Sequence, residues 1–250
     1  MNKLLFFLSL SVLFTANPLL SQMKTDTIEI NQKSKKMKVE IWSDIMCPFC
    51  YIGKRHFEAA LEQFGHADEI EVEWKSFQLD PSLPKPSSKM SVFEYLADRK
   101  GMSLEKSKAM HGQVLQMAKA AGLDYNFDKA VVSNSFDAHR VIQFAKTKGL
   151  GDAAEERFFK AYFIEGEDMC DAATLLKLGL EIGLEQTALK SVIDSDQFSD
   201  EVKRDIFEAG QVGVQGVPFF VFDNKYAVSG AQPVSVFLGT LEKAYTAKTK

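Results

Sequence analysis

The sequence predicts an α/β fold in which strands near both ends of the chain flank a long helical block. Three observations support this: a strand–helix–strand pattern over residues 38–80, no convincing strand over residues 81–200, and a further strand and helix pattern over residues 201–247. With 250 residues, 46% of them hydrophobic, the chain can bury a substantial core without crosslinks. We therefore expect the two end segments to build one sheet, with residues 81–200 as a helical insertion.

The first half of the sheet is predicted from local patterns. Residues 38–43 alternate in polarity and are rich in β-branched side chains, which is typical of a strand. A helix is expected to start at Cys47, because Pro48 suits a first helical turn and apolar residues then recur at helical spacing up to Gly65. Residues 70–77 alternate between apolar and charged side chains, which predicts the second strand.

The middle of the chain is predicted to be helical. Residues 80–88 contain three prolines and three serines, which indicates a linker, and glycines then separate successive helical patterns. The expected helices are 92–100, 103–121, 135–148, 153–163, 172–182 and 186–195, and residues 200–210 are expected to begin the return to the sheet. A buried strand over 218–222, a turn, a strand over 226–229 and a last helix over 233–247 are expected to complete the sheet.

The first 22 residues have the pattern of a signal peptide. Lys3 precedes an apolar run over residues 4–14, and small residues follow. Because this run is shorter than the roughly 18 to 20 residues that span a membrane, we expect cleavage and no stable membrane anchor. A flexible arm over residues 23–37 would follow. The alternative is that Met37 is the true start, in which case the protein would be cytoplasmic.

Charge gives no indication of a nucleic-acid partner. The chain has 30 basic and 34 acidic residues, for a net charge of −4, and no long run of one sign. The lysine cluster over residues 33–38 is expected to be a solvated arm.

The segment Cys47-Pro48-Phe49-Cys50 carries the clearest chemical signal. Cysteines three residues apart at a helix start satisfy the Cα separation of roughly 7 Å or less that a disulfide requires. The unsatisfied N–H groups and positive end of a helix lower the pKa of a thiol placed there. We therefore expect Cys47 to be the nucleophile, and Cys50, one turn further on, to resolve the mixed disulfide between Cys47 and a client.

The residues around the two cysteines are expected to tune their redox balance. Pro48 and Phe49 lie between them, and Phe49 offers no positive partner to a thiolate, which predicts a weaker oxidant than a Cys-Pro-His-Cys protein. Asp44 lies three residues before Cys47, where its charge would oppose thiolate formation. A capping or loop role for Asp44 is the alternative.

Two other interpretations of the cysteines remain open at this point. The pair could be half of a zinc site completed by Cys170 and one histidine, although no second close pair of ligands exists. The histidines in question are His56, His66, His111 and His139. The cysteines could also be ordinary buried residues. Cys170 by itself is expected to be an inert thiol, with dimer crosslinking or client trapping as alternatives.

Three segments together carry a family resemblance. They are Ser43-Asp44-Ile45-Met46-Cys47-Pro48-Phe49-Cys50-Tyr51-Ile52-Gly53, Gly216-Val217-Pro218-Phe219-Phe220-Val221 and Asn134-Ser135-Phe136-Asp137-Ala138-His139-Arg140. Over Met37 to Tyr245 the chain resembles the DsbA-like thioredoxins, specifically the FrnE-type branch. The resemblance implies a thioredoxin-like fold with a large all-helical insertion, disulfide exchange with proteins or small thiols, and a cis-proline loop that faces the cysteines.

The resemblance also suggests roles for individual residues. Val217–Pro218 would be the cis bond, and the backbone of Val217 would pair with a client strand as the substrate-binding loop. For His139 and Arg140 we expect a satisfied core histidine and a structural ion pair. Some FrnE-like proteins carry an additional cysteine pair, but only Cys170 lies outside the main pair here, so a second redox centre is not expected.

The sequence therefore favours a protein disulfide oxidoreductase of the periplasm. Its partners would be thiol-containing client proteins, with a redox partner protein or glutathione in addition, and it would act as a monomer or homodimer without a metal or organic cofactor. The chief alternatives are a glutathione-using isomerase or transferase and a non-enzymatic chaperone-like binding module. The glutathione-using relatives typically have a serine at the position of Cys47, which favours the exchange reaction.

Overall fold

The computed structural model describes residues 36–87 and 90–249. The expected signal peptide over residues 1–22, and all of the expected arm except residues 36 and 37, lie outside the described residues. Within the described part of the chain, no helix is long and apolar enough to cross a membrane.

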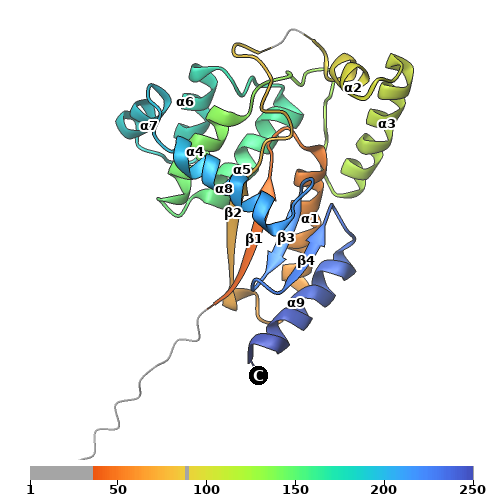
Figure 1. Cartoon of the computed structure of the whole chain (residues 1–250), viewed down its shortest axis with the longest axis vertical. Coiled ribbons are helices and arrows are strands. Elements are labelled where there is room, and N and C mark those ends of the chain that lie inside the picture. Colours follow the sequence, from red (N-terminus) through yellow and green to blue (C-terminus); the bar gives the residue numbers. More distant parts are fainter. Residues whose placement is uncertain (1–35, 88–89, 250) are drawn as a thin grey trace, which may run out of the picture. The chain divides into compact units, whose positions relative to one another are not determined.

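The described residues form one four-stranded mixed sheet, with the strand order β2-β1-β3-β4 (Figure 1). β1 is parallel to β2 and antiparallel to β3, and β3 and β4 form an antiparallel hairpin. The strand bounds are Met37–Ser43 for β1, Ile70–Ser76 for β2, Phe219–Phe222 for β3 and Tyr226–Ser229 for β4. The sheet thus joins segments from the two ends of the described chain.

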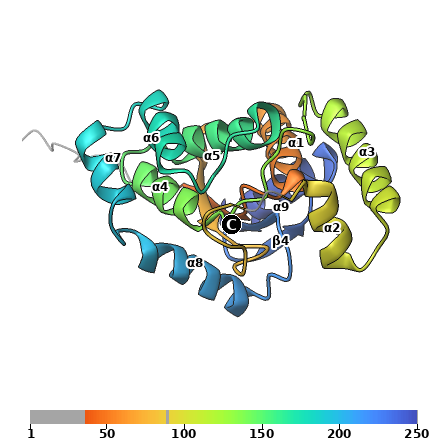
Figure 2. The same ribbon diagram turned by 90° about the horizontal axis from the view of Figure 1, so that it is seen from above.

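Helices cover both faces of this sheet. α1 (Pro48–Gln63) and α9 (Val234–Thr249) pack on one face, where Phe57, Phe220 and Phe237 are buried together. α8 (Ser199–Val212) covers the other face over Trp42, whose indole N–H donates a hydrogen bond of 2.9 Å to the carbonyl of Asp205. Figure 2 shows α1 and α8 on opposite sides of the strands.

The segment between β2 and β3 is helical in the described residues. Its helices are α2 (Val92–Lys100), α3 (Leu104–Ala120), α4 (Phe136–Lys146), α5 (Gly151–Lys160), α6 (Ala172–Glu181), α7 (Gln186–Ile193) and α8. A 3₁₀ turn, η2 (Ala67–Glu69), precedes β2, and a π-helical turn, η3 (Ala161–Glu165), extends α5. The expected helix over 153–163 therefore starts earlier and changes pitch at Ala161, and Gly166 ends it with a positive φ of 79°.

The first turns of α1 are enclosed by these helices. In Figure 2, α1 stands between α5 and α3. The Tyr51 ring stacks on Phe159 with centroids 5.0 Å apart, and its hydroxyl donates a hydrogen bond of 2.6 Å to Glu156. The predicted fold class is confirmed: the chain has a thioredoxin-like mixed α/β fold with a large block of helices between its second and third strands.

Candidate active site

The two cysteines lie at the start of α1, which follows β1 after a short turn. Cys47 is the N-cap residue and Pro48 the first helical residue, so the helix begins one position later than expected. Cys47 therefore lies at the positive end of α1, and no acidic residue in the first turn of the helix offsets that end, although the thiol makes no capping hydrogen bond. Both thiols are free and nearly inaccessible, with 3% of Cys47 and 1% of Cys50 exposed.

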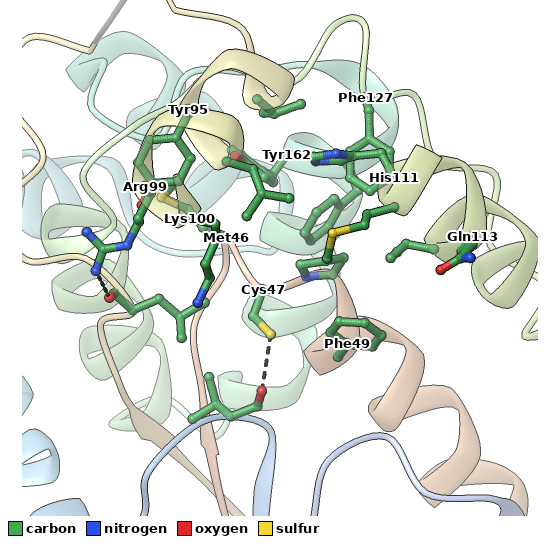
Figure 3. Close-up of a pocket in the computed structure, with 18 of the residues that line it drawn as sticks. Met46, Cys47, Phe49, Tyr95, Arg99, Lys100, His111, Gln113, Phe127 and Tyr162 are labelled. Carbon is green, nitrogen blue, oxygen red and sulfur yellow. Dashed lines mark hydrogen bonds between the residues drawn. The ribbon is translucent and has the colours of Figure 1, made fainter. Parts of the chain in front are cut away.

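A loop from the far end of the chain lies against Cys47. The Cys47 thiol donates a hydrogen bond of 3.3 Å to the carbonyl oxygen of Val217, and the Val217–Pro218 peptide bond is cis (Figure 3). The loop is packed tightly on α1, since a Cβ added to Gly53 would come within 2.9 Å of Pro218 Cγ. The structure therefore brings together Cys47, Cys50, Val217 and Pro218. The Lys85–Pro86 peptide bond is also cis, which the sequence did not predict.

The surroundings of Cys50 strongly affect its pKa. Burial raises the pKa of Cys50 well above its ordinary value, and the neighbouring Cys47 sulfur raises it further. The backbone of Asp44 and the hydroxyl of Ser43 face this thiol and act in the opposite direction. Cys50 is therefore a protonated thiol at neutral pH unless a proton acceptor or a reacting sulfur draws the proton away.

Asp44 fixes the turn that leads into α1. Its carboxylate accepts hydrogen bonds from the backbone N–H of Met46 at 3.2 Å and of Leu79 at 2.7 Å, and its carbonyl accepts from Cys47 N at 2.9 Å. Asp44 thus stabilises the turn before the helix but does not cap α1, whose N-cap is Cys47, and it is buried instead of lying in a solvated loop. The carboxylate is also 1% exposed, and its Oδ1 lies 3.5 Å from Nε2 of His139 on α4.

A pocket of about 540 Å³ opens beside Cys47. Residues 46–49, at the turn and start of α1, and the loop with Gly216 and Val217 line it next to Cys47. The remaining lining comes mainly from α2, α3, η3 and the segment after α3, and most of these side chains are apolar, including Val92, Leu96, Met110, Val114, Met117, Phe127 and Phe163. Tyr95, Arg99, Lys100, His111, Gln113 and Tyr162 are the polar members of the lining, and Figure 3 shows several of them around the cavity.

The buried carboxylate of Asp80 binds two side chains of the pocket lining, Arg99 and Tyr95. Arg99 contacts Asp80 at 2.6 Å and donates to the Leu79 carbonyl at 3.1 Å, and the Tyr95 hydroxyl donates to Asp80 at 2.8 Å. Phe49, by contrast, is 37% exposed at the mouth. The sequence analysis did not predict this pocket, because its walls come from helices whose packing against α1 no local pattern encodes.

The residues singled out in the helical segment have different surroundings. Arg140 pairs with Asp137 at 3.0 Å and donates to the carbonyls of Val192, Ser195 and Gln197, which confirms its structural role. His139 is in the core as expected, with 0% exposed, but neither of its ring nitrogens has a hydrogen-bond partner among the described residues. The expectation of a satisfied histidine is met only in part: the Asp44 carboxylate lies at ion-pair distance, 3.5 Å from Nε2, but neither ring nitrogen makes a hydrogen bond among the described residues.

The zinc alternative has no structural counterpart in residues 36–87 and 90–249. No group of three or more His, Cys, Asp or Glu side chains there could hold a metal ion. Cys170 instead exchanges hydrogen bonds with the backbone of Asn134, accepting from its N–H at 3.1 Å and donating to its carbonyl at 3.3 Å. This thiol is part of the packing of the helical segment.

Comparison with known proteins assigns the family. The model of the DsbA-like thioredoxin domain matches residues 38–242, which is most of the chain. The chain belongs to the DsbA-like thioredoxin family. The solved structure of a protein described as a probable DsbA oxidoreductase from Streptomyces coelicolor is similar at 39% identity and a TM-score of 0.80, over 84% of this chain and 90% of that one.

Two further relatives extend the comparison. The uncharacterized protein YwbO of Bacillus subtilis is 28% identical over 85% of this chain and 97% of its own length. The cytosolic disulfide reductase DsbM of Pseudomonas aeruginosa, solved with glutathione, shares the fold at 17% identity and a TM-score of 0.55, over 84% of this chain and 96% of that one. Members of this family are thiol–disulfide oxidoreductases or isomerases, and the chain shares their fold across the matched region.

Proposed function

We propose that the protein is a thiol–disulfide oxidoreductase that exchanges disulfides with client proteins through Cys47 and Cys50. The observation that carries the proposal is the position of the Cys47 sulfur. It lies at the N-terminus of α1, 3.3 Å from the carbonyl of Val217 in the cis-proline loop, at the edge of a largely apolar pocket. A sulfur in this position has a helix end to stabilise its charge and an open side from which a second sulfur can approach.

In the reducing direction, the Cys47 thiolate attacks one sulfur of a client disulfide. A Cys47–client disulfide forms, and the other client sulfur leaves as a thiolate that takes up a proton from solvent. The Cys50 thiol then loses its proton and attacks the Cys47 sulfur, so that a Cys47–Cys50 disulfide forms and the second client sulfur is released. Two electrons pass from the cysteine pair to the client, and the same steps in reverse oxidise a client dithiol.

The loop and the pocket supply the orientation that the reaction needs. The backbone of Val217, whose carbonyl accepts from the Cys47 thiol in this structure, would pair with an extended client segment beside Cys47, and the cis bond to Pro218 sets the direction of the loop there. Apolar client side chains next to the reacting cysteine would enter the pocket, where methionine side chains such as Met110 and Met117 adapt to different shapes. The residues between the cysteines, Pro48 and Phe49, would set the redox balance, with Phe49 giving a weaker oxidant than a histidine there.

We also propose that the protein acts in the periplasm, after removal of residues 1–22, as a monomer or homodimer. The apolar segment over residues 4–14 and the pattern around it support export. Glutathione is included among the small thiols that the site would exchange with, since the structure of DsbM, which shares this fold, was solved with glutathione.

The decisive experiment is the equilibrium of the purified protein with glutathione buffers, with mass spectrometry to locate the bonds. We expect a reversible Cys47–Cys50 disulfide with a potential between about −120 and −270 mV. Cys47→Ser should abolish exchange with a protein substrate, and Cys50→Ser, given a client that contains a disulfide, should accumulate a Cys47–client disulfide with release of the other client thiol. Cys170→Ser is the matched control and should keep full activity. Exchange that persists in Cys47→Ser, or a pair that forms no bond, would contradict the proposal.

A further inference from the structure

Three ionisable side chains are enclosed behind the cysteine pair. Asp44 in the turn before α1, His139 on α4 and Glu155 on α5 are all at most 1% exposed. Neither ring nitrogen of His139, nor Oε2 of Glu155, has a hydrogen-bond partner among the described residues. Buried polar atoms in proteins are normally paired, so unpaired ones in one place need a physical reason.

Asp44 connects this group to the cysteines. It is 3.5 Å from His139 on one side, and on the other its backbone carbonyl accepts the hydrogen bond of Cys47 N and its backbone N–H faces the Cys50 thiol. A buried negative charge so close to the pair opposes the appearance of a second negative charge on sulfur. A positive charge on His139 would cancel this effect.

We propose that His139 is a positioning residue for disulfide exchange, whose protonated imidazole offsets the buried charge of Asp44 and so favours the reduced, thiolate form of the Cys47–Cys50 pair. The inference rests on the proposed function of that pair. His139 has no access to a client, since it is 0% exposed, and it acts only through Asp44.

The charges around His139 favour its protonated form. Burial is the largest single influence on the pKa of His139 and lowers it, but the carboxylates of Asp44, Glu155 and Asp205 together outweigh burial, so the pKa is raised. The other charged groups around Glu155 are Asp152, Lys54 and Lys146. Tyr95 and Tyr162 face Asp44. His139 therefore keeps its proton to a higher pH than an ordinary histidine, and the offset disappears as pH rises through its raised pKa.

The test removes this charge and measures the redox equilibrium. His139→Gln should shift the equilibrium of the Cys47–Cys50 couple with glutathione about tenfold toward the disulfide at pH 7. This is the size expected for one unit charge at roughly 10 Å and an effective dielectric constant of about 20. The midpoint of the thiolate absorbance at 240 nm should move up by about one pH unit. An unchanged equilibrium and midpoint would overturn the inference.

A double-mutant cycle tests whether His139 acts through Asp44. Burial lowers the pKa of His139, so without the Asp44 charge the imidazole should lose its proton and both charges disappear together. Asp44→Asn alone should therefore leave the equilibrium nearly unchanged, and adding His139→Gln to it should produce less than a third of the shift seen in the wild type. A full shift in the Asp44→Asn background would overturn the inference. Circular dichroism checks folding, and if His139→Gln does not fold, Asp44→Asn decides alone: an unchanged equilibrium supports the inference and a shift toward the dithiol overturns it.

This experiment separates the inference from the function on which it rests. If the wild-type protein forms no Cys47–Cys50 disulfide in glutathione buffers, the proposed function fails before His139 is tested. If the wild type forms the bond and its potential is insensitive to His139, only the role of His139 is refuted.

Discussion

Replacement of Glu155 by glutamine should change how the stability of the protein depends on pH. Burial raises the pKa of Glu155 from 4.5 to about 7, and the charge of His139 moderates the shift. Between pH 4.5 and about 7, the folded protein keeps the Glu155 proton whereas the unfolded chain releases it. The stabilisation that this proton provides is therefore complete below pH 4.5 and is lost as pH rises to about 7. The shift of about 2.5 pH units corresponds to a loss of about 3 kcal/mol.

The assay is urea denaturation of the wild type and Glu155→Gln at closely spaced pH values from 4.5 to 8. Other carboxylates contribute to both curves, so the quantity of interest is the difference between the two proteins. The glutamine amide carries its own burial cost, of about 1 to 3 kcal/mol, but that cost does not change with pH. The difference should therefore move by about 3 kcal/mol in favour of the variant between pH 4.5 and 8. Curves that stay parallel over this range would refute a protonated, buried Glu155.

Two more predictions concern packing around the site. Gly53→Ala places a Cβ within 2.9 Å of Pro218 Cγ, and should cost about 1 to 3 kcal/mol of stability and slow exchange, because the loop beside Cys47 must move. Urea denaturation measures the stability and a disulfide-exchange assay measures the rate. Unchanged values would show that Pro218 can move away from the added Cβ at little cost. Arg140→Ala removes a donor to four backbone carbonyls, and should cost about 3 kcal/mol of stability while leaving the exchange rate of the folded protein unchanged. The stability of Arg140→Lys should fall between that of Arg140→Ala and the wild type. A loss of exchange at full stability would contradict a structural role.

The elements of the fold were largely predictable because their signals are local. The strand over 226–229 and the helix over 92–100 have the predicted bounds, since turn residues and a capping box mark their ends. The helix over 153–163 was predicted less well. Its apolar spacing continues through Phe163, but the backbone widens to a π turn at Ala161, a change that depends on tertiary packing and leaves no periodic signal.

The candidate site was predictable only in part. The close spacing of Cys47 and Cys50 identified the pair directly, and the family resemblance supplied the cis bond before Pro218. The pairing of Asp44 with His139 was not predictable, because the two residues are 95 positions apart and come together only through the packing of α4 behind the turn. A histidine in an apolar helical pattern gives no sign of which group its ring nitrogens meet, and here Nε2 lies 3.5 Å from the Asp44 carboxylate.

The positions of these groups separate two properties of the site. The pocket walls on α2 and α3 lie beside Cys47 and are open to a client, whereas His139 is fully enclosed and touches the cysteine pair only by way of Asp44. Under the proposed function, contacts in the pocket would change which thiol approaches without changing the charge behind the sulfurs. The enclosed charges would change the redox balance without altering the surface that a client meets. The pocket walls on α2 and α3 and the enclosed His139 on α4 and Glu155 on α5 all belong to the helices between β2 and β3. That segment would therefore adjust client choice and redox potential independently while the sheet and the cysteine pair stay the same.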